Sequence, residues 1–400
     1  MLRPFGTNPV PASVLPSAKG LTRRQWLTGA GAAATLLATG CDRLRLRRFA
    51  AAQKEVRVYI FEGYLPEAVL QRFTLRTGFD IHVETYSSND ELYRQLKSGS
   101  VQCDLILPTG YMAQQMRDTG LLVPLDKDKI PHLGLVDRAL CNTHYDSDNR
   151  HTVPFLWGST GIGYDSERLS GLPKSWSALF TRQVGPNLPN AFDNRVTEVK
   201  VSMIDEARFV VGCTLIYLGL DPNTRDPTKI TQAFDLLKQI RDRIDYFEDA
   251  QELLRSRTVG LAMAYTGDVT RAMRGFTAQP EAGGPAVMLA GNRDLRVSLP
   301  QEGSIVWRDV FAVPAMSKNY EGAHAFINFL LDPRRAAEVT NFSCFANTVT
   351  GSQAYVDRFV LNGPSYLMHP SGRNYQLDYS AENDSLQEQL WEELKRGGTA

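Results

Sequence analysis

The chain has 400 residues, of which 44 are basic and 44 acidic, so its formal net charge at pH 7 is zero. Residues 1–40 hold four of the basic side chains and none of the acidic ones, which leaves 40 basic against 44 acidic side chains, a net charge of −4. This balance argues against nucleic acid as a partner, because nucleic-acid binding requires a basic face. A body of about 350 residues exceeds one typical hydrophobic core and indicates two domains.

The first 41 residues have the pattern of an export signal that ends at a lipid attachment point. Thr22-Arg23-Arg24-Gln25-Trp26-Leu27 precedes an apolar run, and Leu37-Ala38-Thr39-Gly40-Cys41 ends it. Twin arginines before such a run are typical of twin-arginine export, and small residues before a cysteine are typical of cleavage with acylation of that thiol. We therefore predict a signal peptide over residues 1–40, a lipid on Cys41 and a basic tether over residues 41–54 that lies on an anionic membrane surface. The competing interpretation is a membrane anchor, but the apolar run is shorter than the ~20 residues that span a bilayer.

A first set of alternating strands and helices follows the tether. The spacing of apolar residues predicts strands over 56–60, 81–86 and 104–108, and helices over 67–78, after the capping-box spacing Ser88-Asn89-Asp90-Glu91, and over 111–120. Such alternation with short connections predicts a parallel sheet with helices on both faces. Ligands then belong at the carboxyl ends of the strands, which are residues 61–64, 86–89 and 108–111.

A second α/β set is expected after Trp157-Gly158-Ser159-Thr160-Gly161, whose small residues suit a crossing or hinge. We predict strands over 199–203 and 259–265, helices over 206–218 and 228–241, a further helix from Asp268, and a Pro/Gly loop over 280–285. A strand over 305–314 then returns to the first lobe, followed by helices over 321–331 and 385–396.

The expected strand ends carry aromatic rings, carboxylates and hydroxyls, which is the composition that an organic cation requires. Aromatic faces attract a desolvated ammonium by ~0.5 to 2 kcal/mol each, and carboxylates accept its hydrogen bonds. The candidates for a cation-binding cleft are Phe61, Glu62, Tyr64, Tyr111, Tyr265, Asp268, Trp307 and Asp309. The alternative treats the rings as core and the acids as caps or surface charge, and Asp268 stands where a helix N-cap belongs. A Trp-x-Asp at the start of a returning strand favours binding over packing for Trp307 and Asp309.

Catalytic and metal-binding patterns are weak by comparison. The six histidines show no HExxH or paired-ligand spacing, no GxGxxG follows the first strand, and Gly158-Ser159-Thr160-Gly161 is neither a nucleophile elbow nor a phosphate loop. We therefore expect no catalytic residue, no metal and no cofactor; an exported cofactor-dependent enzyme is the alternative of a different class. Cys103 and Cys213 lie in apolar patterns and are interpreted as buried small hydrophobic residues, with a disulfide as the alternative.

From about Glu55 to the C-terminus, the chain resembles the periplasmic spermidine- and putrescine-binding proteins of polyamine ABC transporters. The matching segments are Tyr64-Leu65-Pro66, Phe73-Thr74, Thr77-Gly78, Thr85-Tyr86, Ser88-Asn89, Asp104-Leu105-Ile106-Leu107-Pro108, Tyr111, Pro154-Phe155-Leu156-Trp157-Gly158, Tyr265-Thr266-Gly267-Asp268-Val269, Trp307-Arg308-Asp309 and Ile327-Asn328-Phe329-Leu330-Leu331. The resemblance implies an α/β, two-lobe periplasmic-binding-protein-like fold of type II. Each lobe would have a central, mostly parallel sheet flanked by helices, with the ligand cleft between the lobes. We expect lobe 1 to comprise residues 55–157 and 309–345, and lobe 2 residues 158–308 and 346–400.

The resemblance also implies roles for single residues. The positions that match ligand contacts of the family are Phe61, Tyr64, Thr109, Tyr111, Tyr265, Asp268, Trp307, Asp309 and Gln376. Gly63 replaces an acid of the family, with Glu62 one place earlier, and Phe209 replaces a helix glutamate, with Glu206 as the nearest acid. An ammonium would be less well paired without these two carboxylates, and a buried unpaired charge is costly.

Together these features predict a substrate-binding component of an ABC importer, not an enzyme, that binds putrescine or spermidine in the periplasm. The partners implied are the polyamine, the permease subunits and, through the lipid on Cys41, the membrane; a monomer is expected. The nearest alternative ligand is another cationic or zwitterionic metabolite, such as an amino acid derivative.

Overall fold

One mixed sheet of 11 strands organises the protein in the computed structural model, which describes residues 54–141, 143–169, 171–181, 201–248, 250–278, 287–369 and 371–397. The predicted leader, Cys41, the start of the strand predicted over 199–203 and the Pro/Gly loop over 280–285 lie outside these residues. The strands of the main path follow the order β2-β1-β3-β11-β4-β7-β5-β6. Their bounds are β1 (Glu55–Phe61), β2 (Asp80–Tyr86), β3 (Leu105–Ile106), β4 (Thr152–Asp165), β5 (Val201–Met203), β6 (Ile244–Phe247), β7 (Leu261–Tyr265) and β11 (Ser304–Ala312).

Five short strands complete the sheets. They are β8 (Gly275–Ala278), β9 (Val287–Ala290), β10 (Leu295–Ser298), β12 (Ala346–Asn347) and β13 (Asn374–Tyr375). The pair β8 and β9 forms a separate two-stranded sheet, whereas β10 and β12 pair with β4 and β13 pairs with β11.

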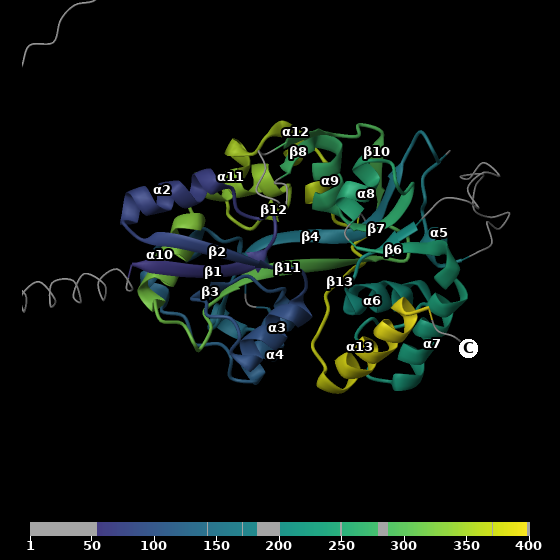
Figure 1. Cartoon of the computed structure of the whole chain (residues 1–400), viewed down its shortest axis with the longest axis horizontal. Helices are drawn as coiled ribbons and strands as arrows, with labels where there is room; N and C mark the ends of the chain where they lie inside the picture. The colour runs from purple at the N-terminus through teal and green to yellow at the C-terminus, as the bar shows by residue number, and fades with distance from the viewer. Residues whose placement is uncertain are drawn as a thin grey trace, which may run out of the picture. The chain divides into compact units, whose positions relative to one another are not determined.

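The helices pack around these strands (Figure 1). They are α2 (Glu67–Thr77), α3 (Asn89–Ser98), α4 (Gly110–Asp118), α5 (Ser177–Phe180), α6 (Ala207–Tyr217), α7 (Pro227–Gln239), α8 (Ala250–Arg255), α9 (Thr266–Arg274), α10 (Tyr320–Leu330), α11 (Pro333–Ser343), α12 (Arg358–Leu361) and α13 (Ala381–Lys395). None of the helices in the described part of the chain is both long and apolar enough to cross a membrane.

The sheet has a parallel group at each end and two long antiparallel strands between them. Strands β2 and β3 pair in parallel with β1, and β6 and β7 pair in parallel with β5. Strands β4 and β11 run side by side through the middle and join the two groups (Figure 1). We call the end with β1, β2 and β3 the first lobe and the end with β5, β6 and β7 the second lobe. The predicted α/β class with mostly parallel lobes is confirmed.

The residues predicted to end helix α2 and to begin helix α3 lie at those positions in the structure. Helix α2 ends at Gly78, which adopts the left-handed conformation at φ 75° that glycine accepts without strain. At the start of α3, Ser88 accepts a hydrogen bond from the backbone N–H of Glu91 at 3.2 Å. The Glu91 carboxylate accepts from the backbone of Ser87 rather than from that of Ser88, so only half of the capping box forms.

Strand β4 is the longest element that the sequence analysis did not predict. All 14 of its residues are buried, and the small residues expected to form a crossing or hinge lie inside it. Gly158 pairs with Trp307 of β11, and a Cβ at Gly158 would lie 2.6 Å from the Trp307 ring. The glycine therefore makes room for the indole at the centre of the sheet.

Cys103 and Cys213 are buried, as predicted. Burial raises the pKa of the Cys103 thiol to about 12 and that of Cys213 well above its ordinary value. Both thiols therefore stay protonated at neutral pH and pack as small hydrophobic groups.

Candidate functional site

Three chain segments bring polar side chains together around Asp309. The Asp309 side chain, on β11, is 1% exposed and accepts hydrogen bonds from the Tyr64 hydroxyl at 2.7 Å and from the Thr109 hydroxyl at 2.8 Å. Tyr64 follows β1, and Thr109 lies between β3 and α4. The carboxyl ends of β1 and β3 thus meet β11 at one point, where the sequence places a ligand.

Burial sets the electrostatics of this cluster. It raises the pKa of Asp309 to about 7, although the two hydroxyl hydrogen bonds act to lower it. The pKa of Tyr64 and that of Tyr86 are raised well above the ordinary value, first by burial and then by the Asp309 charge. Both phenols are therefore neutral donors, and within the described residues no basic side chain lies within 4.0 Å of the Asp309 carboxylate.

A second buried carboxylate lies where the two lobes meet. Glu206 of the second lobe is the N-cap residue of α6, and its side-chain carboxylate accepts from the backbone N–H of Asn89 at 3.2 Å and from the Tyr111 hydroxyl at 3.3 Å. The Asn89 side chain also donates to Thr109 Oγ1 at 3.1 Å, and it accepts from the Thr109 backbone N–H at 3.1 Å. Asn89 therefore links the hydrogen bonds of Glu206 to those of Asp309.

Aromatic rings form a continuous wall beside the two acids. The rings of Tyr265 and Phe345 contact that of Trp307 edge-on, with centroids at 5.4 Å and 5.1 Å. Phe209 lies 5.5 Å from Tyr265 and 6.3 Å from Tyr111. Such rings can pack against the methylene groups of a ligand and attract its cationic end.

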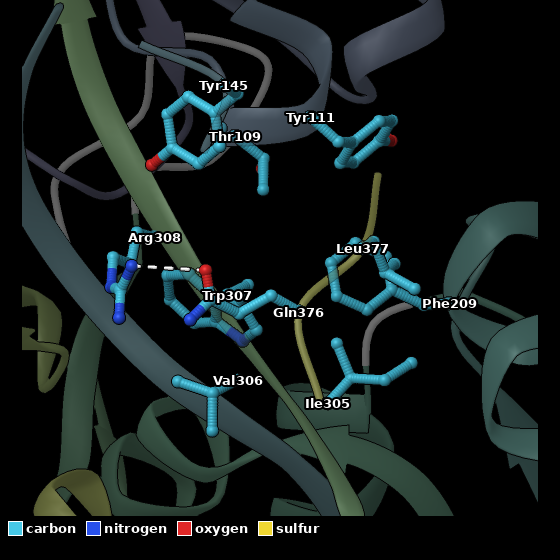
Figure 2. Close-up of a pocket in the computed structure, with 11 residues that line it drawn as sticks. Thr109, Tyr111, Tyr145, Phe209, Ile305, Val306, Trp307, Arg308, Gln376 and Leu377 are labelled. Carbon is cyan, nitrogen blue, oxygen red and sulfur yellow. Dashed lines mark hydrogen bonds between the residues drawn. The ribbon is translucent and has the colours of Figure 1, made fainter. Parts of the chain in front are cut away.

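A narrow pocket opens among these elements. Its lining residues are Thr109, Gly110, Tyr111, Tyr145, Phe209, Ile305, Val306, Trp307, Arg308, Gln376 and Leu377 (Figure 2). The Gln376 side-chain oxygen accepts from Arg308 Nη1 at 3.2 Å. Thr109, Tyr111, Trp307 and Gln376 are thus predicted site residues that line one cavity.

Three predicted residues lie away from this pocket. Phe61 packs on Tyr64 and Tyr86 at the carboxyl end of β1, with ring centroids at 5.6 Å and 4.4 Å. Glu62 is exposed, and Asp268 lies in the first turn of α9, whose N-cap is Tyr265 rather than Asp268. Both acids raise the pKa of Arg271, against the lowering that its burial causes, so they already face a cation of the protein.

Asn89, Tyr145, Arg308 and Phe345 are among the residues at or beside the pocket that the sequence analysis missed. Asn89 had a signal, because it belongs to a predicted strand end, but it was interpreted only as part of a helix start. Arg308 stands between two predicted residues. Tyr145 and Phe345 carry no local signal, since contacts between distant segments of the chain place them.

No group of three or more His, Cys, Asp or Glu side chains in the described part of the chain could hold a metal ion. The pocket therefore offers hydrogen bonds, aromatic faces and two nearby carboxylates. These groups can bind a ligand, and a positively charged one best.

Comparison with known proteins gives consistent matches over most of the chain. The model of the bacterial extracellular solute-binding protein family matches residues 68–360. The chain is 28% identical to the putrescine-binding periplasmic protein PotF of Escherichia coli over 94% of this chain and 98% of that protein. It is 31% identical to spermidine/putrescine-binding periplasmic protein 1 of Haemophilus influenzae over 73% of this chain and 74% of that one. The crystal structure of the TpPotD lipoprotein of Treponema pallidum superposes with a TM-score of 0.70 at 23% identity, covering 85% of this chain and 99% of that one.

Proposed function

Because the chain belongs to the bacterial extracellular solute-binding protein family, we propose that it captures a polyamine such as putrescine or spermidine and delivers it to an ABC permease. The names of the relatives from E. coli and H. influenzae support a ligand of this class. The observation that carries the proposal is Asp309, a buried carboxylate that has two neutral hydroxyl donors and no basic partner among the described residues. An ammonium group would supply the missing positive charge.

Binding would use both lobes. An ammonium beside Asp309 and Glu206 would exchange its hydration shell for charge-assisted hydrogen bonds, while the methylene chain packs on Trp307 and Phe209. Glu206 and Tyr111 come from different lobes, and their hydrogen bond links the two lobes. A ligand held by both lobes would favour this closed arrangement over an open one, as in hinge closure around a ligand.

Isothermal titration calorimetry with putrescine and spermidine tests the amine site. We expect Asp309→Asn to weaken binding at least tenfold, because it removes the charge but keeps the shape of the side chain. Asp235→Asn is the matched control, since Asp235 is exposed on α7 and is not among the residues that line the pocket. Equal affinities of the wild type and of Asp309→Asn would refute the assignment of the site.

Export and anchoring form a second part of the proposal. The twin arginines and Cys41 support a lipoprotein exported by the twin-arginine route and held at the periplasmic face of a membrane. Metabolic labelling with palmitate should mark the wild type and leave Cys41→Ser unlabelled, whereas labelled Cys41→Ser would contradict the attachment site. Replacing Arg23 and Arg24 by Lys should retain the precursor in the cytoplasm, and normal export of that variant would contradict the route.

The lobe boundaries and the oligomeric state are also proposals. We propose that lobe 1 comprises residues 55–157 and 309–345, that lobe 2 comprises residues 158–308 and 346–400, and that the protein acts as a monomer. The joining of both lobes through β4 and β11 supports boundaries within these two strands. Sedimentation with and without ligand tests the monomer, and a stable dimer would overturn it.

A further inference from the structure

A guanidinium of the protein itself lies at the end of the cleft beside Tyr64. Arg271 belongs to α9 of the second lobe, and its side chain lies against Gly63 of the first lobe, where an added Cβ would collide with Arg271 Nη1. Gly63 has a φ of 75°, which glycine adopts without strain. The absence of a side chain at Gly63 therefore makes room for an arginine that reaches from one lobe to the other.

The surroundings of this guanidinium are those of a cation-binding site. Arg271 Cζ lies 4.8 Å from the ring centroid of Phe276 and 5.5 Å from that of Phe342. Burial lowers the pKa of Arg271, whereas the charges of Asp268 and Glu62 raise it. Aromatic faces and carboxylates are also what an ammonium group requires. Arg271 thus occupies a place that would otherwise suit an amine.

This place adjoins the cluster around Asp309. Tyr64 follows Gly63 in the chain and donates to Asp309 at 2.7 Å. Burial raises the pKa of Tyr64 most, and the charges of Asp309 and Asp268 add to the rise, so both acids lie within electrostatic reach of one phenol. A polyamine with one ammonium beside Asp309 and another past Tyr64 would therefore meet the positive charge of Arg271, which repels it.

Packing alone does not explain an arginine at this position. Burial disfavours the charged form of Arg271, and its Nε is buried without a hydrogen-bond partner. Both features cost stability, and an apolar side chain of similar length would fill the space without them. What the charge does provide is repulsion of a second cation from this end of the cleft.

The pocket limits the ligand on its other side. A diamine can use the carboxylates of Asp309 and Glu206, because Glu206 accepts from Tyr111, which lines the pocket. Across the pocket from Tyr111, the wall includes Arg308, whose charge acts on the nearby Tyr145 hydroxyl and lowers its pKa against the rise that burial causes (Figure 2). A third ammonium would therefore meet a guanidinium in either direction.

We propose that Arg271 is a specificity-determining residue, whose guanidinium occupies the cation subsite that Glu62 and Asp268 would otherwise offer and keeps the further ammonium of a triamine out of the cleft. The inference rests on the amine site of the proposed function and narrows its ligand class to short diamines. Asp309 still binds one ammonium, whereas Glu62 and Asp268 become available to a ligand only when the charge of Arg271 is removed.

Calorimetry on the purified protein with putrescine and spermidine tests this inference. We expect the wild type to bind putrescine at least ten times more tightly than spermidine. Arg271→Met removes the charge but keeps a long side chain, so it should raise the affinity for spermidine at least tenfold and change that for putrescine less than threefold. Arg271→Lys keeps a positive charge and should retain the preference for putrescine, and Arg225→Met, at an exposed arginine, should change neither affinity.

The outcomes separate this inference from the function on which it rests. Equal affinities of the wild type for the two amines would overturn the role of Arg271 and leave the amine site in place, and this comparison needs no variant to fold. An unchanged spermidine affinity in Arg271→Met, or an equal loss for both amines, would also overturn it, the latter by assigning Arg271 a structural role only. If neither amine binds the wild type, or if Asp309→Asn binds putrescine normally, the proposed function itself is wrong, and the inference with it.

Discussion

Amine binding should depend on pH through one proton on Asp309. Burial raises the pKa of this carboxyl to about 7 in the ligand-free structure. An ammonium pairs with the carboxylate and not with the carboxylic acid, so the proton must leave when the ligand binds. The ligand amine stays charged throughout, because its pKa of about 10 lies well above this range.

The size of the effect follows from this pKa. The ionised fraction of a group with a pKa of about 7 falls from about 0.9 at pH 8 to about 0.1 at pH 6. The affinity should therefore fall about tenfold over these two pH units, which is about 1.4 kcal/mol. Above pH 8 the affinity should be level, and below pH 6 it should fall about tenfold for each further unit.

Calorimetry in pairs of buffers with different ionisation enthalpies measures the proton directly. We expect release of about 0.9 protons per ligand at pH 6 and about 0.1 at pH 8. Asp309→Asn should bind weakly at every pH and release no proton, whereas Asp235→Asn should behave like the wild type. A wild-type affinity that is the same at pH 6 and pH 8, without proton release, would refute the reasoning.

Three further predictions follow from the same contacts. The pKa of Asp309 is higher in the folded chain than its ordinary 3.8, so the stabilisation that its proton gives is complete below pH 3.8 and is lost as the pH rises through about 7. The stabilisation lost when Asp309 ionises in the folded protein is about 4 kcal/mol. In calorimetric scans, ligand-free Asp309→Asn should therefore melt at a higher temperature than the wild type at pH 8, and the difference should be smaller at pH 5. Asn89→Ala removes the link between Glu206 and Thr109 and should weaken amine binding about tenfold by titration. Phe209→Glu adds an acid where a second ammonium would lie, so it should increase the affinity for putrescine at least tenfold and lower the melting temperature of the ligand-free protein. An unchanged putrescine affinity would contradict the placement of the ligand's methylene chain.

Much of the first lobe could be predicted because its signals are local. Alternating apolar residues mark β1 and β2, and Gly78 marks the end of α2. Since parallel strands end at the same edge of a sheet, their terminal residues could be expected to meet, and Tyr64 and Thr109 do meet at Asp309.

The parts that could not be predicted depend on pairing across the chain. Strand β4 pairs with β11, β12, β7 and β10 along its edges, and all 14 of its residues are buried on both faces, so its sequence shows no alternation of polar and apolar residues, and its glycines suggest a loop. Glu62 and Asp268 have the right charge for an amine site, but both already interact with the positive charge of Arg271, whose pKa they raise. The position of Arg271 follows from α9 and from its contacts with the rings of Phe276 and Phe342, which no spacing in the sequence reveals.

The closed arrangement itself explains why an unpaired acid is useful in a binding protein. Contacts of Glu206 with Asn89 and Tyr111 link the lobes, and in this arrangement Asp309 is buried and its pKa is raised. If closure adds to the burial of Asp309, closure without ligand leaves either a costly charge or an extra proton on this carboxyl, which disfavours the empty closed form at neutral pH. A cation beside Asp309 removes that cost only in the closed form, so it shifts the population toward closure by the difference in its affinity for the two forms. A binding protein built in this way presents a closed surface to its permease mainly when it carries cargo, because the buried carboxylate makes empty closure unfavourable.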